Sequence, residues 1–93
     1  MKGLYAIVDY ELLRDRIFEW TQQIITAGVQ IIQFRAKNLT DKELVTLALK
    51  LRNLAQDIIF IINDRPDIAL VVEADGVHLG QDDMPVTLAR KIL

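Results

Sequence analysis

The sequence predicts an α/β fold built on a parallel sheet. Four short apolar runs rich in β-branched residues alternate with four segments in which apolar residues recur at helical spacing. The apolar runs contain almost no polar residues, which is typical of parallel strands covered on both faces. The order βαβαβαβα then requires right-handed crossovers between neighbouring strands.

The predicted strands are residues 4–8, 29–34, 58–62 and 76–79, and the predicted helices are residues 13–27, 40–54, 66–72 and 85–93. Gly28 stands where the first helix would end, since glycine is common just past a helix C-terminus. The second helix opens with Thr40 in the pattern TDKE, which is a capping box. Pro66 is a favourable first-turn residue for the third helix, and Pro85 opens the fourth.

The repeat length predicts a barrel. The β/α unit recurs about every 25 residues, as in a (β/α)₈ barrel of about 200–250 residues. The 93 residues hold four units, so we expect a single domain, residues 1–93, that is the amino-terminal half of a TIM barrel. Four strands leave two unpaired edges and an apolar concave face. We therefore expect a truncated parent protein, a homo-oligomer, or completion by a second half-barrel.

Composition narrows the function classes. Hydrophobic residues make up 52% of the chain and charged residues 26%, with a net charge of −2 and no basic stripe of the kind that binds nucleic acid. The absence of cysteine excludes disulfides and thiolate chemistry. No apolar stretch reaches the roughly 18 residues of a membrane span, and the start MKGLYAIVDY lacks a secretory signal. We expect a cytoplasmic protein with no membrane or nucleic-acid partner.

Polar residues gather after the predicted strands, at the edge of a parallel sheet where ligands bind. In strand order they are Asp9; Gln33, Arg35 and Lys37; Asn63 and Asp64; and Gln81, Asp82 and Asp83. Strand alternation places Gln33, Arg35 and Asn63 on the face that points into the barrel mouth, because a glutamine buried against the helices would lack partners.

The combination of charges at this edge suggests a diphosphate site. Carboxylates such as Asp64 and Asp83 suit Mg²⁺, a hard ion that prefers oxygen ligands. Arg35 and Lys37 add positive charge for phosphate oxygens shared with that metal.

Structural roles for these residues remain open alternatives. Arg35 and Lys37 could be ordinary surface charges at the sheet edge. Asp64 could cap the third helix, and Asp82 or Asp83 the fourth.

The roles expected for the other polar and aromatic residues are structural. His78 is a lone histidine in a short strand, for which a hydrogen-bonded structural role is expected rather than acid–base chemistry. Tyr5 is expected to pack at the barrel mouth, and Trp20 in the core. The glycines of DGVHLGQ form no phosphate-binding loop pattern.

The stretches GVQIIQFRAKNLTDKEL and FIINDRPDIALVVEADGVHLGQDDMP resemble the thiamine-phosphate synthases, as does the opening strand LYAIVD. The resemblance covers essentially the whole chain but only the amino-terminal half of that family's barrel. It implies a transferase that condenses hydroxymethylpyrimidine diphosphate with thiazole phosphate to give thiamine phosphate and pyrophosphate. No protein nucleophile is then expected, because the thiazole nitrogen captures the pyrimidine cation.

The same resemblance implies roles for individual residues. Those that match the pyrimidine-diphosphate contacts are Gln33, Arg35 and Lys37, in the family's Q-x-R-x-K segment, and Asn63. Those that match the two Mg²⁺ ligands are Asp64 and Asp83. Asp82 stands where the family commonly has glutamate, and His78 matches a common histidine without a defined role.

Two other functions remain in view. The thiazole tautomerases share the fold and part of the pattern, but they tend to lose the aspartate after the asparagine and the acidic GQDD ending, both present here. The family's second half, which holds the thiazole phosphate, is not within these residues. A non-catalytic, self-associating half-barrel is therefore the second hypothesis.

Overall fold

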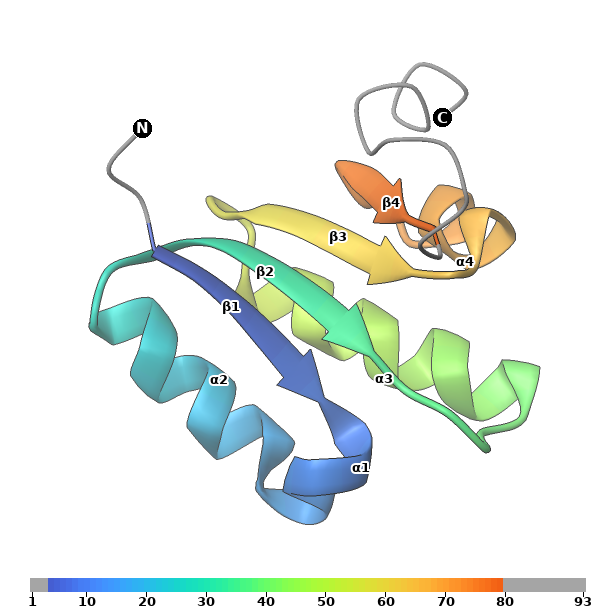
Figure 1. Ribbon diagram of the computed structural model, residues 1–93, viewed down its shortest axis with the longest axis horizontal. Helices are drawn as coiled ribbons and strands as arrows, with labels where there is room; N and C mark the ends of the chain where they lie inside the picture. Colours follow the sequence, from blue (N-terminus) through green and yellow to red (C-terminus); the bar gives the residue numbers. More distant parts are fainter. Residues whose placement is uncertain (1–3, 80–93) are drawn as a thin grey trace.

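A computed structural model describes residues 4–79 as a four-stranded parallel sheet with helices on one face (Figure 1). The elements are β1 (Leu4–Asp9), α1 (Tyr10–Leu13), the 3₁₀ helix η1 (Arg14–Arg16), α2 (Ile17–Thr26), β2 (Val29–Arg35), α3 (Asp41–Leu54), β3 (Ile59–Asn63), α4 (Pro66–Val71) and β4 (Gly76–His78). The predicted helix 85–93 and the residues Gln81, Asp82 and Asp83 lie outside the described residues.

The sheet has the order β1-β2-β3-β4, and every neighbouring pair is parallel. This confirms the predicted α/β class, and each strand agrees with its predicted span to within one residue at either end. The sequential order is that of successive β/α units, in which each helix returns the chain to the next strand.

One face of the sheet forms the core with the helices. The side chains of Val8, Ile32, Phe34, Phe60, Ile62 and Val77 are at most 1% exposed. They pack with Ile17 of α2, Leu51 of α3 and Ile68 of α4 in one apolar cluster. Burying each large apolar side chain contributes about 1.5–3 kcal/mol, so this layer supplies most of the driving force for folding.

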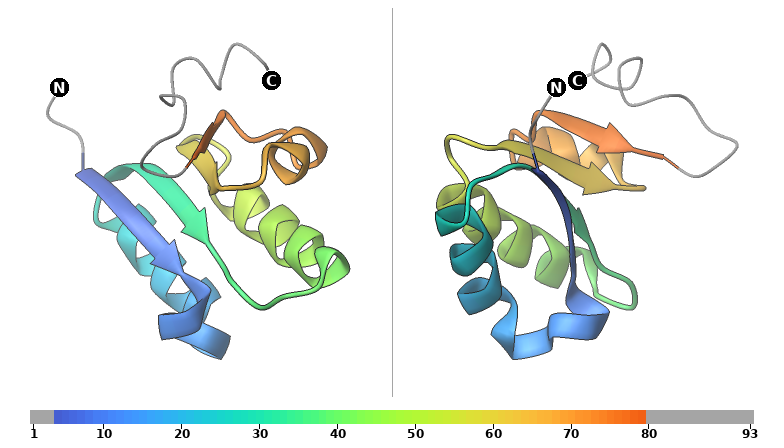
Figure 2. Two further views of the ribbon diagram at one scale, coloured as in Figure 1. Left: turned by 45° about the vertical axis from the view of Figure 1, so that its right-hand side comes forward. Right: turned by 60° about the vertical axis from the view of Figure 1, so that its left-hand side comes forward.

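The opposite face of the sheet has no helix against it among residues 4–79. Figure 2 shows α2 and α3 together on one side of the curved sheet. On the other side Tyr5, Ile7 and Ile59 are 50%, 49% and 37% exposed. Exposed apolar side chains, as expected from the sequence, are therefore present on the face without helices, and we call this surface the inner face.

The first predicted helix is divided in the structure. Asp9 caps α1 by accepting a hydrogen bond from the Glu11 backbone N–H at 2.8 Å. Arg14 then takes a φ of 50°, which ends α1 before α2 begins at Ile17. A non-glycine residue in this region is uncommon, and hydrophobic spacing carries no signal for it. The prediction of one continuous helix over 13–27 was wrong at this point.

The helix signals at Gly28, Thr40 and Pro66 are confirmed. Gly28 has a φ of 101°, which ends α2 in the left-handed region that glycine adopts readily. Thr40 and Glu43 form both hydrogen bonds of the capping box at the start of α3, at 3.1 and 2.9 Å. α4 begins at Pro66. Trp20 packs against the core while remaining partly exposed.

A polar cluster joins β3 and β4 at their amino-terminal ends. One Asp75 carboxylate oxygen accepts hydrogen bonds from the Phe60 N–H at 2.8 Å and from Arg52 Nη1 at 3.2 Å. Arg52 also donates to the carbonyls of Ala55 and Ile58. In folds of this kind the amino-terminal edge of the sheet serves stability rather than ligand binding.

No helix within residues 4–79 is long and apolar enough to cross a bilayer.

Candidate functional site

A row of polar residues lies along the carboxyl edge of the sheet. Asp9 pairs in register with Arg35, and Asn63 pairs with His78. Arg35 and Asn63 each follow the paired residues Phe34 and Ile62, so the four polar residues stand at one level. Alternation along the strands directs them to the inner face, because their neighbours pack against the helices. We call this row the rim.

Gln33 lies one level below the rim, in register with Ile7 and Ile61. It is only 4% exposed. Its Nε2 donates a hydrogen bond to the Tyr5 hydroxyl at 2.6 Å, which satisfies one donor of the amide. Strand alternation thus placed Gln33 on the correct face, whereas the hydrogen bond to Tyr5 was not predicted. The signal was available, since Tyr5 and Ile7 alternate onto the same face.

Asn63, Asp64 and His78 form a connected group at the ends of β3 and β4. Asn63 Nδ2 donates to Asp64 Oδ2 at 3.1 Å, and His78 Nδ1 lies 3.3 Å from Asn63 Oδ1. The Asp64 backbone N–H donates to the His78 carbonyl at 2.7 Å. The expected hydrogen-bonded role of His78 agrees with this contact, and its specific partner is what only the structure supplies.

Asp64 occupies an unusual backbone conformation, with a φ of 63°. This left-handed conformation carries a free-energy cost of about 1–2 kcal/mol for a residue with a Cβ, although aspartate tolerates it better than most. Non-glycine residues held in such conformations cluster at functional sites. The side chain of Asp64 is exposed at the rim.

The alternative role of Asp64 as a helix cap is not seen. The N-cap of α4 is Arg65, and no side chain caps that helix. Arg65 instead donates hydrogen bonds to the Asp67 carboxylate at 2.9 and 3.0 Å and to the Asp41 carboxylate at 3.0 Å. These contacts join the start of α4 to the start of α3. The hydrogen bonds that Arg65 donates to Asp67 and to Asp41 raise the pKa of Arg65, and the contact with Asp67 lowers the pKa of that carboxyl.

Arg35 and Lys37 carry the positive charge of the site. Arg35 is partly exposed at the rim and Lys37 is exposed just beyond it. Within the described part of the chain neither forms an ion pair. Asp9, the register partner of Arg35, uses its carboxylate to cap α1. Both cations are therefore available to an anionic ligand.

The rim residues fit a hard divalent cation in part. Residues 4–79 contain no group of three or more His, Cys, Asp or Glu side chains that could hold a metal. Asp64 offers an exposed carboxylate, of which only Oδ2 has a hydrogen-bond partner among these residues. Such an oxygen suits Mg²⁺, which takes one or two carboxylates and keeps several waters. The second expected ligand, Asp83, lies outside the described residues.

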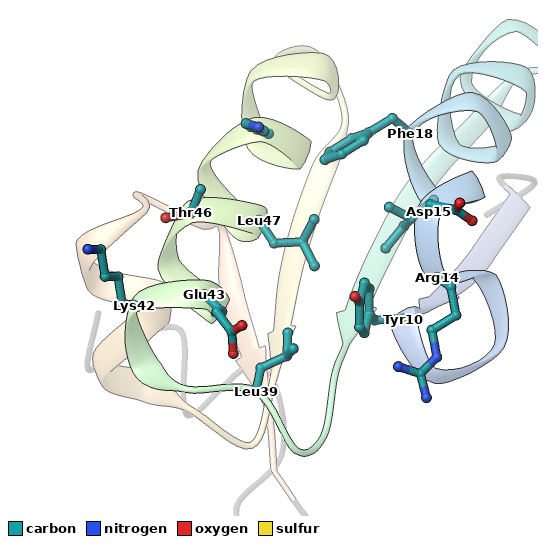
Figure 3. Close-up of a pocket in the computed structure, with 11 residues that line it drawn as sticks. Tyr10, Arg14, Asp15, Phe18, Leu39, Lys42, Glu43, Thr46 and Leu47 are labelled. Carbon is teal, nitrogen blue, oxygen red and sulfur yellow. The ribbon is translucent and has the colours of Figure 1, made fainter.

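A separate cavity of about 410 Å³ lies on the helical side of the molecule. Figure 3 shows Tyr10, Phe18 and Leu47 facing the space between α1, α2 and α3. Lys50 stands over the Phe18 ring at 5.7 Å, and Arg14 over the Tyr10 ring at 5.4 Å. None of the rim residues lines this cavity, so it is distinct from the candidate site.

Comparison with known proteins assigns the chain to a family. The family model described as thiamine monophosphate synthase matches residues 4–93. This chain belongs to that family. The resemblance carried by the strand-end motifs is therefore confirmed.

Individual relatives within the thiamine monophosphate synthase family agree with the assignment. The thiamine-phosphate synthase of Clostridium perfringens strain 13 is 44% identical over 94 residues, which cover 99% of this chain and 45% of that protein. That of Persephonella marina is 47% identical, with 98% and 45% covered. The solved thiamine phosphate pyrophosphorylase of Pyrococcus furiosus has a TM-score of 0.79 at 37% identity, and covers 97% of this chain and 45% of that one. The chain spans about half the length of these relatives.

Proposed function

We propose that this chain forms the pyrimidine-diphosphate side of a thiamine-phosphate synthase site. The proposed reaction is the condensation of hydroxymethylpyrimidine diphosphate with thiazole phosphate, which yields thiamine phosphate and pyrophosphate. The domain is proposed to be the amino-terminal half of a (β/α)₈ barrel. Its cytoplasmic location remains a prediction from the sequence.

One observation carries the proposal: Asn63 and Asp64 meet at the end of β3, at the same sheet edge as Arg35. Residues with amide, carboxylate and guanidinium groups therefore stand at the ends of two neighbouring strands, along an edge where parallel α/β folds bind ligands. Family membership supports the same reading of this edge.

The chemistry needs charge stabilisation more than a reactive side chain. The bond between the pyrimidine methylene carbon and the diphosphate oxygen breaks, and its electron pair leaves with pyrophosphate. The lone pair of the thiazole nitrogen forms the new carbon–nitrogen bond. Arg35 and Lys37 stabilise the charge that develops on the leaving group, and this contact strengthens toward the transition state.

The remaining residues are proposed to bind and orient the pyrimidine substrate and the metal ion. Gln33, held by Tyr5 on the inner face, and Asn63 at the rim are the proposed contacts to the pyrimidine substrate. Asp64, with Asp83, is proposed to hold Mg²⁺. When bound, that ion neutralises diphosphate charge as a Lewis acid.

The proposal is tested by calorimetric titration of the chain with the pyrimidine diphosphate in the presence of Mg²⁺. Arg35→Ala and Lys37→Ala are each expected to weaken binding about tenfold, since a charge-assisted hydrogen bond is lost. Lys42→Ala is the control, because Lys42 is an exposed lysine of α3 outside the rim. Equal affinity in all variants would remove both cations from the site.

A second candidate is a non-catalytic half-barrel that associates with itself. The exposed inner-face residues Tyr5, Ile7 and Ile59 favour it, because an apolar sheet face of this kind is seldom left in water. The mass of the particle in solution, with an assay for thiamine phosphate, separates the two candidates. A dimer that forms no thiamine phosphate would support the non-catalytic half-barrel. Formation of thiamine phosphate would exclude that candidate.

A further inference from the structure

The orientation of the Asn63 amide is determined by its neighbour. Asn63 Nδ2 lies 3.1 Å from Asp64 Oδ2. An ionised carboxylate only accepts hydrogen bonds, so the amide nitrogen, and not its oxygen, must face Asp64. The Asn63 oxygen Oδ1 is then directed to the other side, where it lies 3.3 Å from His78 Nδ1.

The same reasoning determines the tautomer of His78. An amide oxygen can only accept, so the hydrogen bond to Asn63 requires a proton on His78 Nδ1. In a neutral imidazole the other nitrogen, Nε2, then has no proton. The chain of donors therefore runs in one direction, from His78 through Asn63 to Asp64.

We propose that His78 is a positioning residue for the rim, which acts through the Asn63 amide on the Asp64 carboxylate. This inference rests on the proposed function, because it assigns His78 to the ligand site formed there. The hydrogen bond from Asn63 holds Oδ2 of Asp64 and leaves Oδ1 for a cation. Partners of this kind, one shell away from a metal ligand, commonly change metal affinity by about 10–100-fold.

The backbone contributes to the same arrangement. The Asp64 N–H donates to the His78 carbonyl at 2.7 Å, and Asn63 pairs with His78 in the β3–β4 register. β4 therefore holds Asp64 in its left-handed conformation with a main-chain contact, and orients its carboxylate through the His78 side chain. Only the second contact depends on the histidine ring, so substitutions of His78 can test it separately.

The tautomer is measured by nitrogen NMR on the ¹⁵N-labelled chain. The sequence contains one histidine, so the ring signals need no further assignment. The spectra are recorded at alkaline pH, where the ring ¹⁵N signals no longer change when the pH is raised further. We expect a protonated Nδ1 and an unprotonated Nε2, with loss of that preference in Asn63→Ala. A protonated Nε2 in the parent chain would overturn the proposal.

Two substitutions test the effect on the site. In His78→Asn the amide nitrogen takes the place of Nδ1, whereas in His78→Gln it takes the place of Nε2. With inorganic pyrophosphate as the probe and Mg²⁺ varied, we expect His78→Gln to weaken Mg²⁺-dependent binding about tenfold and His78→Asn to stay within about twofold. Equal affinity in the two variants would overturn the positioning role. Their unfolding midpoints serve as a control, because a purely structural role would lower stability without separating the two affinities.

Failure of the proposed function gives a different result. If the parent chain binds no pyrophosphate with Mg²⁺, the rim is not a diphosphate site and the positioning role falls with it. The NMR measurement then still decides whether the contact between His78 and Asn63 exists.

Discussion

Gln33 donates a hydrogen bond to the hydroxyl of Tyr5 across β1 and β2, with 2.6 Å between Nε2 and the oxygen. The two residues differ in environment, since Gln33 is 4% exposed and Tyr5 is 50% exposed. The buried amide is thus fixed by a side chain that stands at the surface of the inner face. The first strand thereby orients a residue proposed to bind substrate on the second.

Replacing Tyr5 with phenylalanine is expected to destabilise the fold by about 1–3 kcal/mol, because a buried amide donor loses its partner. The measurement is urea unfolding followed by circular dichroism. Tyr10→Phe is the matched control, since within residues 4–79 the Tyr10 hydroxyl has no hydrogen bond. A loss of stability of the same size in both variants would show that the Gln33 contact is not the cause.

Replacing Asp64 with glycine separates the backbone role of this position from its carboxylate. The backbone at position 64 has a φ of 63°, which glycine adopts more readily than alanine. The Asp64→Gly variant should therefore be more stable than Asp64→Ala by about 1 kcal/mol. Both variants should lose Mg²⁺-dependent binding of the pyrimidine diphosphate. The measurements are urea unfolding and calorimetry. Retained binding in either variant would remove Asp64 from the proposed metal site.

Replacing Asp75 with alanine is expected to lower the free energy of unfolding by about 2 kcal/mol, because the Phe60 N–H and Arg52 lose a charged acceptor. Asp57→Ala is the control, since Asp57 is an exposed carboxylate in the turn before β3. Asp75 lies at the edge of the sheet away from the rim. Under conditions where the variant is fully folded, its affinity for the diphosphate should therefore not change. A change in affinity would mean that the two edges are coupled.

The free energy of unfolding should decrease at acidic pH, because two surface carboxylates, Glu43 and Asp67, become protonated. The Thr40 backbone N–H, and then its hydroxyl, lower the pKa of Glu43 below its usual 4.5, and Arg65 lowers the pKa of Asp67 below its usual 3.8. Both folded-state pKa values lie below those of the unfolded chain. The contribution of these two carboxylates to the free energy of unfolding is therefore complete above about pH 5. It is lost as the pH falls through their lowered folded-state pKa values.

The check is the urea midpoint measured from pH 7 to pH 3 for the parent chain and for Glu43→Gln. Glutamine keeps the capping-box hydrogen bond but cannot titrate, so the fall in acid should be shallower. Glu19→Gln, an exposed position of α2, is the control. Identical curves for the parent chain and Glu43→Gln would contradict the assignment.

Much of the fold could be predicted because its signals are local. The apolar runs gave strands that agree with the structure to within one residue, and Gly28, Thr40 and Pro66 marked helix ends through their own backbone and side-chain chemistry. The break at Arg14 was missed, because a left-handed backbone at a non-glycine residue depends on what surrounds it. Of the predicted site residues, Asp83 lies outside residues 4–79.

The sequence alone determined the α/β class, the parallel order and the edge at which the polar residues would gather. These follow from periodicity and from the common direction of parallel strands, both of which are properties of the chain itself. The tertiary structure decided which polar atoms meet: Gln33 with Tyr5, and Asp64 with Asn63 and His78. A hydrogen bond depends on distances of a few tenths of an ångström between separate strands, and only the packed register of the sheet sets those distances.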